Sequence, residues 1–222
     1  MVKEGKPILT LGISVSRIPM LDRTSSTKEA VIPAMTALAQ KSLLLTVRDY
    51  RMLPETGPRY QLIEGDLYMS PAPQFFHQDI SMRLGSRLYN HVTKYRLGKI
   101  VASPVDVFLN EHNAYQPDLI FVSKDRLSII HKNGVHGAPD LIVEILSPGT
   151  KRLDLGPKRR VYALRGVKEF WVVDPVKREV SVYLLQVDGK KPVAVWKEGQ
   201  TFTSDLLPGL EVAVSEVFNE EV

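Results

Sequence analysis

The spacing of hydrophobic and polar residues changes several times along the chain, and each spacing predicts a different element. Residues 141–146 read LIVEIL, so apolar side chains occupy both faces of a two-residue repeat and predict a strand buried on both sides. From His77 to Leu97, apolar residues instead recur every three or four positions, which predicts a long helix that ends at Gly98. His77 begins the inward face of this helix.

Weaker patterns predict the remaining elements. We expect a short helix within residues 43–53, two strands around a turn at Gly65-Asp66 within residues 60–69, strands at 100–109, 116–122, 169–174 and 179–186, and a second helix from Pro157 to Gly166. This order of helices and strands predicts an α/β sandwich with a mixed sheet.

Residues 1–40 differ from the rest, because their apolar residues are scattered and show no sustained period. We expect them to form an N-terminal extension that is disordered or loosely attached, with no signal peptide and no membrane span. Residues 41–222 are long enough for one domain with a substantial core.

Composition restricts the possible chemistry. The chain has no cysteine, which excludes disulfides and thiolate metal sites and favours a cytoplasmic protein. Its net charge is +4, and residues 1–40 contribute half of that excess, with five basic and three acidic side chains. Global charge is therefore weak evidence for a nucleic-acid partner, and local clustering has to support that interpretation.

Two carboxylates on apolar strands are the strongest candidates for chemistry. Glu144 lies in the middle of the predicted buried strand, where an ionised carboxylate is costly unless a metal ion, a cation or several donors meet it. Asp118 precedes another apolar run, Leu119 to Val122. If the two strands are neighbours, a divalent metal or a basic side chain is needed between the charges, and Mg²⁺ or Mn²⁺ prefers such oxygen ligands. That ion would assist phosphodiester hydrolysis.

Pro117-Asp118 followed by Glu144 in a hydrophobic strand resembles the PD-(D/E)xK nuclease superfamily. The blocks YQLIEGDLYMSPAP, QPDLIFVS, GAPDLIVEILSP and LGPKRRVYALRGVKEFWVVDP are similar in order and spacing to one branch of it, the Uma-type restriction endonuclease family, long carried as a domain of unknown function. The resemblance covers residues 42–215 and implies a restriction-endonuclease-like fold, in which a central mixed β-sheet is flanked by helices. It also implies a Mg²⁺-dependent DNA endonuclease, with Mn²⁺ as the alternative ion.

Carried over to this chain, the family pattern implies that Asp118 and Glu144 hold the metal ion. The superfamily's lysine should stand two residues after the glutamate, where this chain has Leu146. We expect Lys158 to supply the missing cation, because it shares a helix face with Tyr162, which we assign a supporting role. Lys158 would orient the attacking water or stabilise charge on the phosphate.

Five further residues have roles in the same hypothesis. Glu64 would complete the metal shell, and His77 would hydrogen-bond to a carboxylate or a phosphate. Lys151, Arg152 and Arg159 belong to a basic run that would bind nucleic acid.

Each assignment has a structural alternative. Asp118 can cap a turn, Glu144 can form a buried ion pair with Lys158, and His77 can bond only to the backbone. A turn glutamate such as Glu64 is usually solvated, and a basic run usually lies on a solvated helix face.

Other enzyme classes receive no support from the sequence. It lacks GxxxxGK[ST], GxGxxG, HExxH and GxSxG, so we expect no nucleotide cofactor, zinc-protease site or esterase site. We predict an endonuclease that binds DNA as a homodimer, because two copies related by a two-fold axis most simply cut both strands. A catalytically inactive nuclease-fold binding or regulatory module is the alternative, for which Leu146 is the argument. RNA or a branched intermediate is a further possible substrate.

Overall fold

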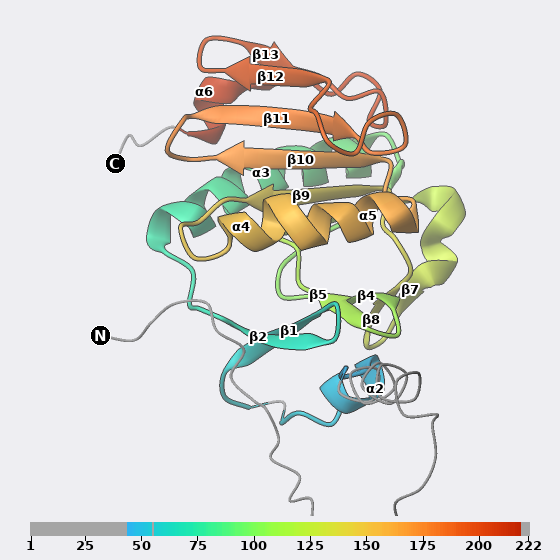
Figure 1. Ribbon diagram of the computed structural model, residues 1–222. Coiled ribbons are helices and arrows are strands. Elements are labelled where there is room, and N and C mark those ends of the chain that lie inside the picture. The colour runs from blue at the N-terminus through green and yellow to red at the C-terminus, as the bar shows by residue number, and fades with distance from the viewer. Residues whose placement is uncertain (1–43, 55, 219–222) are drawn as a thin grey trace, which may run out of the picture.

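Two six-stranded β-sheets form the framework of the computed structural model, which describes residues 44–54 and 56–218. We call them the central sheet, with strand order β12-β11-β10-β9-β6-β3, and the hairpin sheet, with strand order β2-β1-β5-β4-β8-β7. Figure 1 shows the hairpin sheet below the central sheet. The predicted N-terminal extension, residues 1–40, lies outside the described residues.

The strands are short. The central sheet contains β12 (Ala194–Lys197), β11 (Glu179–Leu184), β10 (Glu169–Asp174), β9 (Leu141–Ile145), β6 (Leu119–Ser123) and β3 (Gly98–Ala102). The hairpin sheet contains β2 (Asp66–Ser70), β1 (Arg59–Ile63), β5 (Asn113–Tyr115), β4 (Val107–Asn110), β8 (Gly134–His136) and β7 (Ile130–His131). A small third sheet pairs β13 (Thr201–Phe202) with β14 (Val212–Ala213).

Helical elements pack on both sheets, and the first of them lies against the hairpin sheet. They are α2 (Val47–Tyr50), α3 (Phe75–Lys94), η1 (Lys124–Ile129), α4 (Lys151–Leu153), η2 (Asp154–Lys158), α5 (Arg159–Arg165) and α6 (Val214–Val217). Within the sheet, β9 and β10 are parallel and the other neighbouring strands are antiparallel. A mixed sheet flanked by helices confirms the predicted α/β class. None of the described helices is long and apolar enough to cross a membrane.

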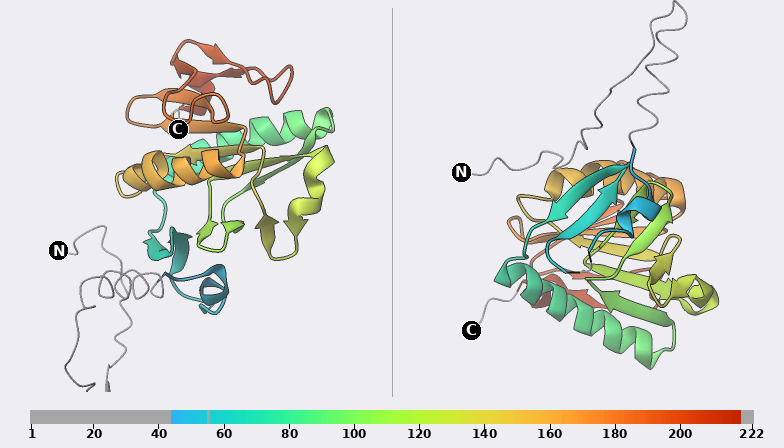
Figure 2. Two further views of the ribbon diagram at one scale, coloured as in Figure 1. Left: turned by 45° about the vertical axis from the view of Figure 1, so that its right-hand side comes forward. Right: turned by 90° about the horizontal axis from the view of Figure 1, so that it is seen from below.

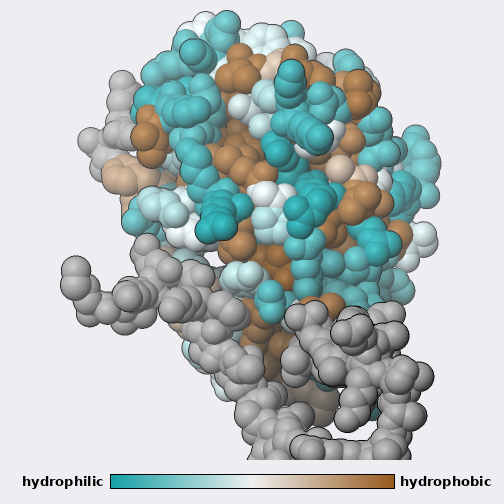
Figure 3. Space-filling view, in the orientation of Figure 1, coloured by the Kyte–Doolittle hydropathy of each residue, from teal (hydrophilic) through white to brown (hydrophobic). Residues whose placement is uncertain are grey.

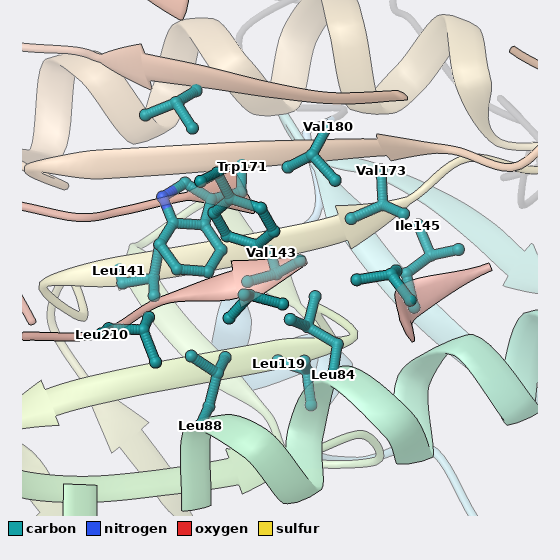
Figure 4. Packing of buried hydrophobic residues seen from close by; sticks show 14 of the residues in the cluster. Leu84, Leu88, Leu119, Leu141, Val143, Ile145, Trp171, Val173, Val180 and Leu210 are labelled. Atoms are coloured by element: carbon teal, nitrogen blue, oxygen red, sulfur yellow. The ribbon is translucent and has the colours of Figure 1, made fainter. Parts of the chain in front are cut away.

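The strand β9 is buried on both faces because helices pack on both sides of it. In Figure 2, α3 lies on one face of the central sheet and α4 and α5 lie on the other. Figure 4 shows Leu141, Val143 and Ile145 on the face toward α3, where Leu84 and Leu88 pack. The alternate positions of β9 pack with residues of α5. Two buried faces explain why the strand is apolar without alternation.

The predicted strand 100–109 is wrong, because the chain crosses between the two sheets within it. Its first part is β3 in the central sheet and its second part is β4 in the hairpin sheet. Pro104 lies between them and has no backbone N–H, so it cannot continue a hydrogen-bonded ladder. The pair β1–β2 of the hairpin sheet confirms the two strands predicted within residues 60–69, but β5, β8 and β7 were not predicted, because they are only two or three residues long.

Of the two short helices, the first lies within the predicted range and the second begins earlier than predicted. The first is a single turn, α2, which begins at a capping box between Thr46 and Asp49. The second begins earlier than Pro157, because α4, η2 and α5 form one continuous helical segment from Lys151 to Arg165. Pro157 lies within the π-helical turn η2. Gly166 ends the segment with a φ of 88°.

We expect Leu84→Ala to lower the free energy of unfolding by about 2–5 kcal/mol, because the residue is fully buried between α3 and the central sheet. Met82→Ala is the matched control on the same helix, since that side chain is 70% exposed, and it should change stability by less than about 0.5 kcal/mol. Urea denaturation measures both. Equal effects of the two substitutions would contradict this packing of α3.

Candidate active site

Glu144 lies on β9 in the middle of the central sheet, with β10 on one side and β6 on the other. Leu119 of β6 pairs with Val143, so the antiparallel register brings Asp118 opposite Glu144 where the β6–β9 ladder ends. The Glu144 side chain is almost completely buried against the segment α4–η2–α5. Its Oε1 accepts hydrogen bonds from Lys158 Nζ at 3.1 Å and from the Tyr162 hydroxyl at 2.6 Å.

Asp154, Lys158 and Tyr162 present one face of the helical segment to Glu144. They follow one another at four-residue spacing, which places successive side chains on the same face of a helix. Lys158 is only 3% exposed, and its Nζ lies 2.8 Å from Asp154 Oδ1 as well as 3.1 Å from Glu144 Oε1. A buried ammonium therefore bridges a strand carboxylate and a helix carboxylate.

Burial determines which of these groups can change protonation. It raises the pKa of Glu144 to about 8, although the Lys158 charge opposes this shift. Burial alone would lower the pKa of Lys158, but the carboxylates of Asp154 and Glu144 outweigh it and hold that pKa above its ordinary range. Burial and the charge of Glu144 raise the pKa of Tyr162 well above its ordinary value. Lys158 is therefore a permanent cation, and Glu144 is the group that titrates near neutral pH.

Asp118 and His77 meet the backbone of Ile145 at the end of the β6–β9 ladder. The Ile145 N–H donates to Asp118 Oδ2 at 2.7 Å, and His77 Nε2 donates to the Ile145 carbonyl at 3.0 Å. His77 Nε2 also lies 3.4 Å from Asp118 Oδ2. These contacts satisfy the N–H and the carbonyl of Ile145, which have no hydrogen-bond partner on β6 because the β6–β9 ladder ends before this residue. Burial lowers the pKa of His77, but hydrogen bonding to Asp118 and the charge of that carboxylate raise it above its ordinary value overall.

The donor set fits a divalent cation. Among the described residues, no hydrogen-bond donor reaches Asp118 Oδ1 or Glu144 Oε2. When all groups are ionised, Asp118, Glu144 and Asp154 carry three negative charges against the single positive charge of Lys158. Mg²⁺ commonly uses one or two protein carboxylates and completes its shell with water and substrate phosphates. The described residues contain no group of three or more acidic or histidine side chains that could hold a metal ion, so an ion here would rely on two carboxylates and on water or substrate oxygens.

Comparison with known proteins identifies the family to which the chain belongs. The family model of Uma2, described as "Putative restriction endonuclease", matches residues 47–215. The chain belongs to the Uma2 family. Its fold is similar to the crystal structure of "a putative nuclease belonging to DUF820" from Anabaena variabilis ATCC 29413, with a TM-score of 0.67 and 23% sequence identity over 78% of this chain and 97% of that chain. Among curated proteins, none matches the chain.

In this Uma2 protein, the predicted residues Glu144, Lys158 and Tyr162 are in direct contact, and His77 lies against Asp118. Their catalytic roles stay predictions. Asp154 was missed by the sequence reasoning. The signal was present, because Asp154 has the same four-residue spacing to Lys158 as Lys158 has to Tyr162.

The structure does not bring Glu64 into the ligand set that the Uma2 resemblance implied. Its carboxylate accepts two hydrogen bonds from Arg160 Nη2, at 2.7 and 2.8 Å, and is about half exposed. The local backbone explains this direction. Glu64 and Gly65 form the two-residue turn between β1 and β2, with φ values of 52° and 85°, so the turn lies one residue earlier than we predicted.

The predicted basic run does not form one stripe. Lys151 pairs with Asp174 at 3.2 Å, and Arg159 donates to the backbone carbonyl of Lys190 at 3.1 Å. Arg152 is exposed and makes no hydrogen bond to another described residue. On the face that carries α4 and α5, hydrophilic and hydrophobic side chains alternate in small patches (Figure 3). Within this run, Arg152 is therefore an exposed cation that no described acceptor engages.

We expect Lys158→Met to lower the free energy of unfolding by about 3–5 kcal/mol, because it leaves Glu144 and Asp154 without their buried counterion. Arg152→Met on the same helical segment is the matched control and should change stability by less than about 0.5 kcal/mol. Urea denaturation in the presence of a chelator measures both. If Lys158→Met were as mild as the control, the buried ion pair would be refuted.

The metal-free protein should lose stability as the pH rises from about 5 to about 8. Burial raises the Glu144 pKa from 4.5 to about 8, so the folded state holds a proton that the unfolded state releases. That stabilisation is complete below pH 4.5 and is lost as the pH rises through about 8, and the raised pKa of His77 acts in the same direction. Urea midpoints at stepped pH measure the slope, which should be clearly shallower in Glu144→Gln. An unchanged slope in that variant would contradict a raised Glu144 pKa.

Proposed function

We propose that this Uma2 protein is a Mg²⁺-dependent endonuclease that hydrolyses phosphodiester bonds in DNA. One observation carries the proposal: among the described residues, no donor reaches Asp118 Oδ1 or Glu144 Oε2, and Glu144 contacts the buried, positively charged Lys158. Family membership and the similarity in fold support the nuclease class. Mn²⁺ would serve as an alternative ion, since it prefers the same oxygen ligands.

Asp118 Oδ1 and Glu144 Oε2 would hold the ion. When bound, it would polarise the phosphate and lower the pKa of a bound water molecule. The protein prepares both oxygens by engaging the other oxygen of each carboxylate. Ile145 N–H fixes Asp118, and Lys158 together with Tyr162 fixes Glu144, so neither carboxylate needs to reorient on binding.

Lys158 would stabilise negative charge on the phosphate or orient the attacking water. It cannot act as the base at neutral pH, because its pKa is held above the ordinary lysine range. The ammonium comes from the helical segment because Leu146, at the superfamily's lysine position, packs in the apolar core between the central sheet and α5. His77 would support Asp118, and its raised pKa favours a positive charge there.

The proposal extends to partners and location. The substrate would be DNA, and Arg152 would contact its backbone from the exposed side of the helical segment. We propose a homodimer, because two copies related by a two-fold axis would cut both strands of a duplex. The absence of cysteine is consistent with work in the cytoplasm.

A second candidate is a nuclease-fold module that binds nucleic acid without cleaving it. The observation in its favour is the enclosure of Lys158, which is only 3% exposed and already paired with the carboxyl groups of Glu144 and Asp154. A lysine in that state would need a small rearrangement to meet a phosphate. Direct assay of cleavage separates this candidate from the enzyme.

We expect cleavage of supercoiled and linear plasmid DNA in Mg²⁺ or Mn²⁺ and none in chelator. Asp118→Asn and Glu144→Gln should each lower the rate by about 100-fold or more, because each removes a charge from the metal site. Lys197→Ala, an exposed lysine on β12, is the control and should retain full activity. Calorimetric titration with Mn²⁺ reports metal binding independently of cleavage. Metal binding without cleavage would favour the inactive module, and cleavage that survives both substitutions would indicate a contaminant.

A further inference from the structure

A groove of about 400 Å³ lies where the edges of the two sheets approach each other. One wall is formed by β3 and β6 of the central sheet, and the other by the β7–β8 hairpin, which Figure 1 shows at the edge of the hairpin sheet. The volume is within the range of small-ligand sites in proteins. None of the predicted catalytic residues lines this groove.

Aliphatic side chains are exposed on both walls. Lys99 pairs with Val122 and Val101 pairs with Ile120 across β3 and β6, so these four side chains share the face that lines the groove. Val101 is 40% exposed on this wall, and Ile130 of the hairpin is 39% exposed on the other. Two accessible aliphatic side chains on opposite walls suit a flat ring between them.

Two side-chain oxygen atoms in the groove wall can accept further hydrogen bonds. Asp106 Oδ1 accepts from the Tyr50 hydroxyl and from Gln116 Nε2, each at 2.9 Å. Among the described residues, no donor reaches Asp106 Oδ2 or Gln116 Oε1. Both residues line the groove, so its polar part offers acceptors to an incoming donor.

Two lysines complete the lining. Lys99 and Lys132 have no ion-pair partner among the residues that the structure describes. A groove with accessible apolar walls, acceptor oxygens and unpaired ammonium groups is complementary to a ring that carries an amine and an attached phosphate.

The groove lies next to the proposed site along one strand. Gln116 and Ile120 line the groove, and each lies two residues from Asp118 in the sequence. The Ile120 side chain lies on the face of the central sheet that forms the groove wall. At about 3.3 Å per residue, the groove begins about 7 Å from Asp118 along β6. An occupant would therefore lie beside the scissile bond rather than on a remote surface.

We propose that this groove binds one unpaired nucleotide of the DNA, adjacent to the bond that is cleaved. The inference rests on the proposed nuclease function. The base lies between Val101 and Ile130, and the ammonium groups of Lys99 and Lys132 meet the flanking phosphates. Asp106 and Gln116 accept from an exocyclic amine, so cytosine, which presents one, is preferred over thymine, which has none.

Fluorescence anisotropy of the full chain in Ca²⁺ or in chelator, with labelled oligocytidylate and oligothymidylate of equal length, tests the proposal. Wild type should bind the cytosine strand more tightly. The double variant Lys99→Ala/Lys132→Ala should lose at least about tenfold in affinity and lower the salt slope by about 1.4, the value for two lost phosphate contacts on a single strand. The double variant Lys190→Ala/Lys197→Ala is the control, since both lysines are exposed away from the groove, and it should bind like wild type.

Ile130→Trp, which fills the groove, provides a second variant that leaves the charges unchanged. It should remove the preference for cytosine while retaining the salt slope. If the Lys99/Lys132 variant and Ile130→Trp bind and cleave DNA like wild type, the nucleotide site in the groove is refuted and the nuclease proposal is retained. If the wild-type protein neither binds nor cleaves DNA, both the nucleotide site and the nuclease proposal are refuted.

Discussion

The buried ammonium of Lys158 is the interaction on which the site depends. It lies between Glu144 on β9 and Asp154 on the adjacent helical turn, and all three side chains are removed from water. Each charge alone would be costly in that environment, so the position of the helical segment against the central sheet is coupled to the pairing of these charges. This interaction explains how the sequence LIVEIL can carry a glutamate in a strand with two buried faces. It also explains why the helical segment turns Lys158 inward rather than toward solvent.

Much of this arrangement could be predicted from sequence, because it depends on local periodicity. The two-residue pattern of 141–146 identified β9, and the four-residue spacing of Lys158 and Tyr162 placed them on one helix face. The Asp154 carboxylate followed the same rule and was overlooked. Glu64 could not be placed, because its direction depends on a backbone conformation with positive φ and on an arginine 96 residues away. In the hairpin sheet the β1–β2 pair could be predicted, but β5, β7 and β8 could not, since strands of two or three residues are too short to show a period.

The location of the cation has a physical reason as well. The position two residues after Glu144 points to the layer between the central sheet and α5, where Leu146 packs with the apolar residues of that helix. An ammonium group at that point would need its own counterions inside the apolar layer. Lys158 enters from the helix instead and brings Asp154 with it, one turn away. The helix therefore supplies both the cation and the acceptor that makes its burial tolerable.

Folding and the proposed chemistry use different atoms of the same carboxylates. Asp118 accepts the Ile145 N–H through Oδ2, and Glu144 accepts from Lys158 and Tyr162 through Oε1, so one oxygen of each is committed to the fold. Under the proposed function, the remaining oxygens would meet the ion, and the bonds to the other oxygen of each carboxylate would position them. Structural and catalytic interpretations of these residues are thus compatible. A backbone amide that fixes a carboxylate in place lowers the reorganisation that ion binding would otherwise require.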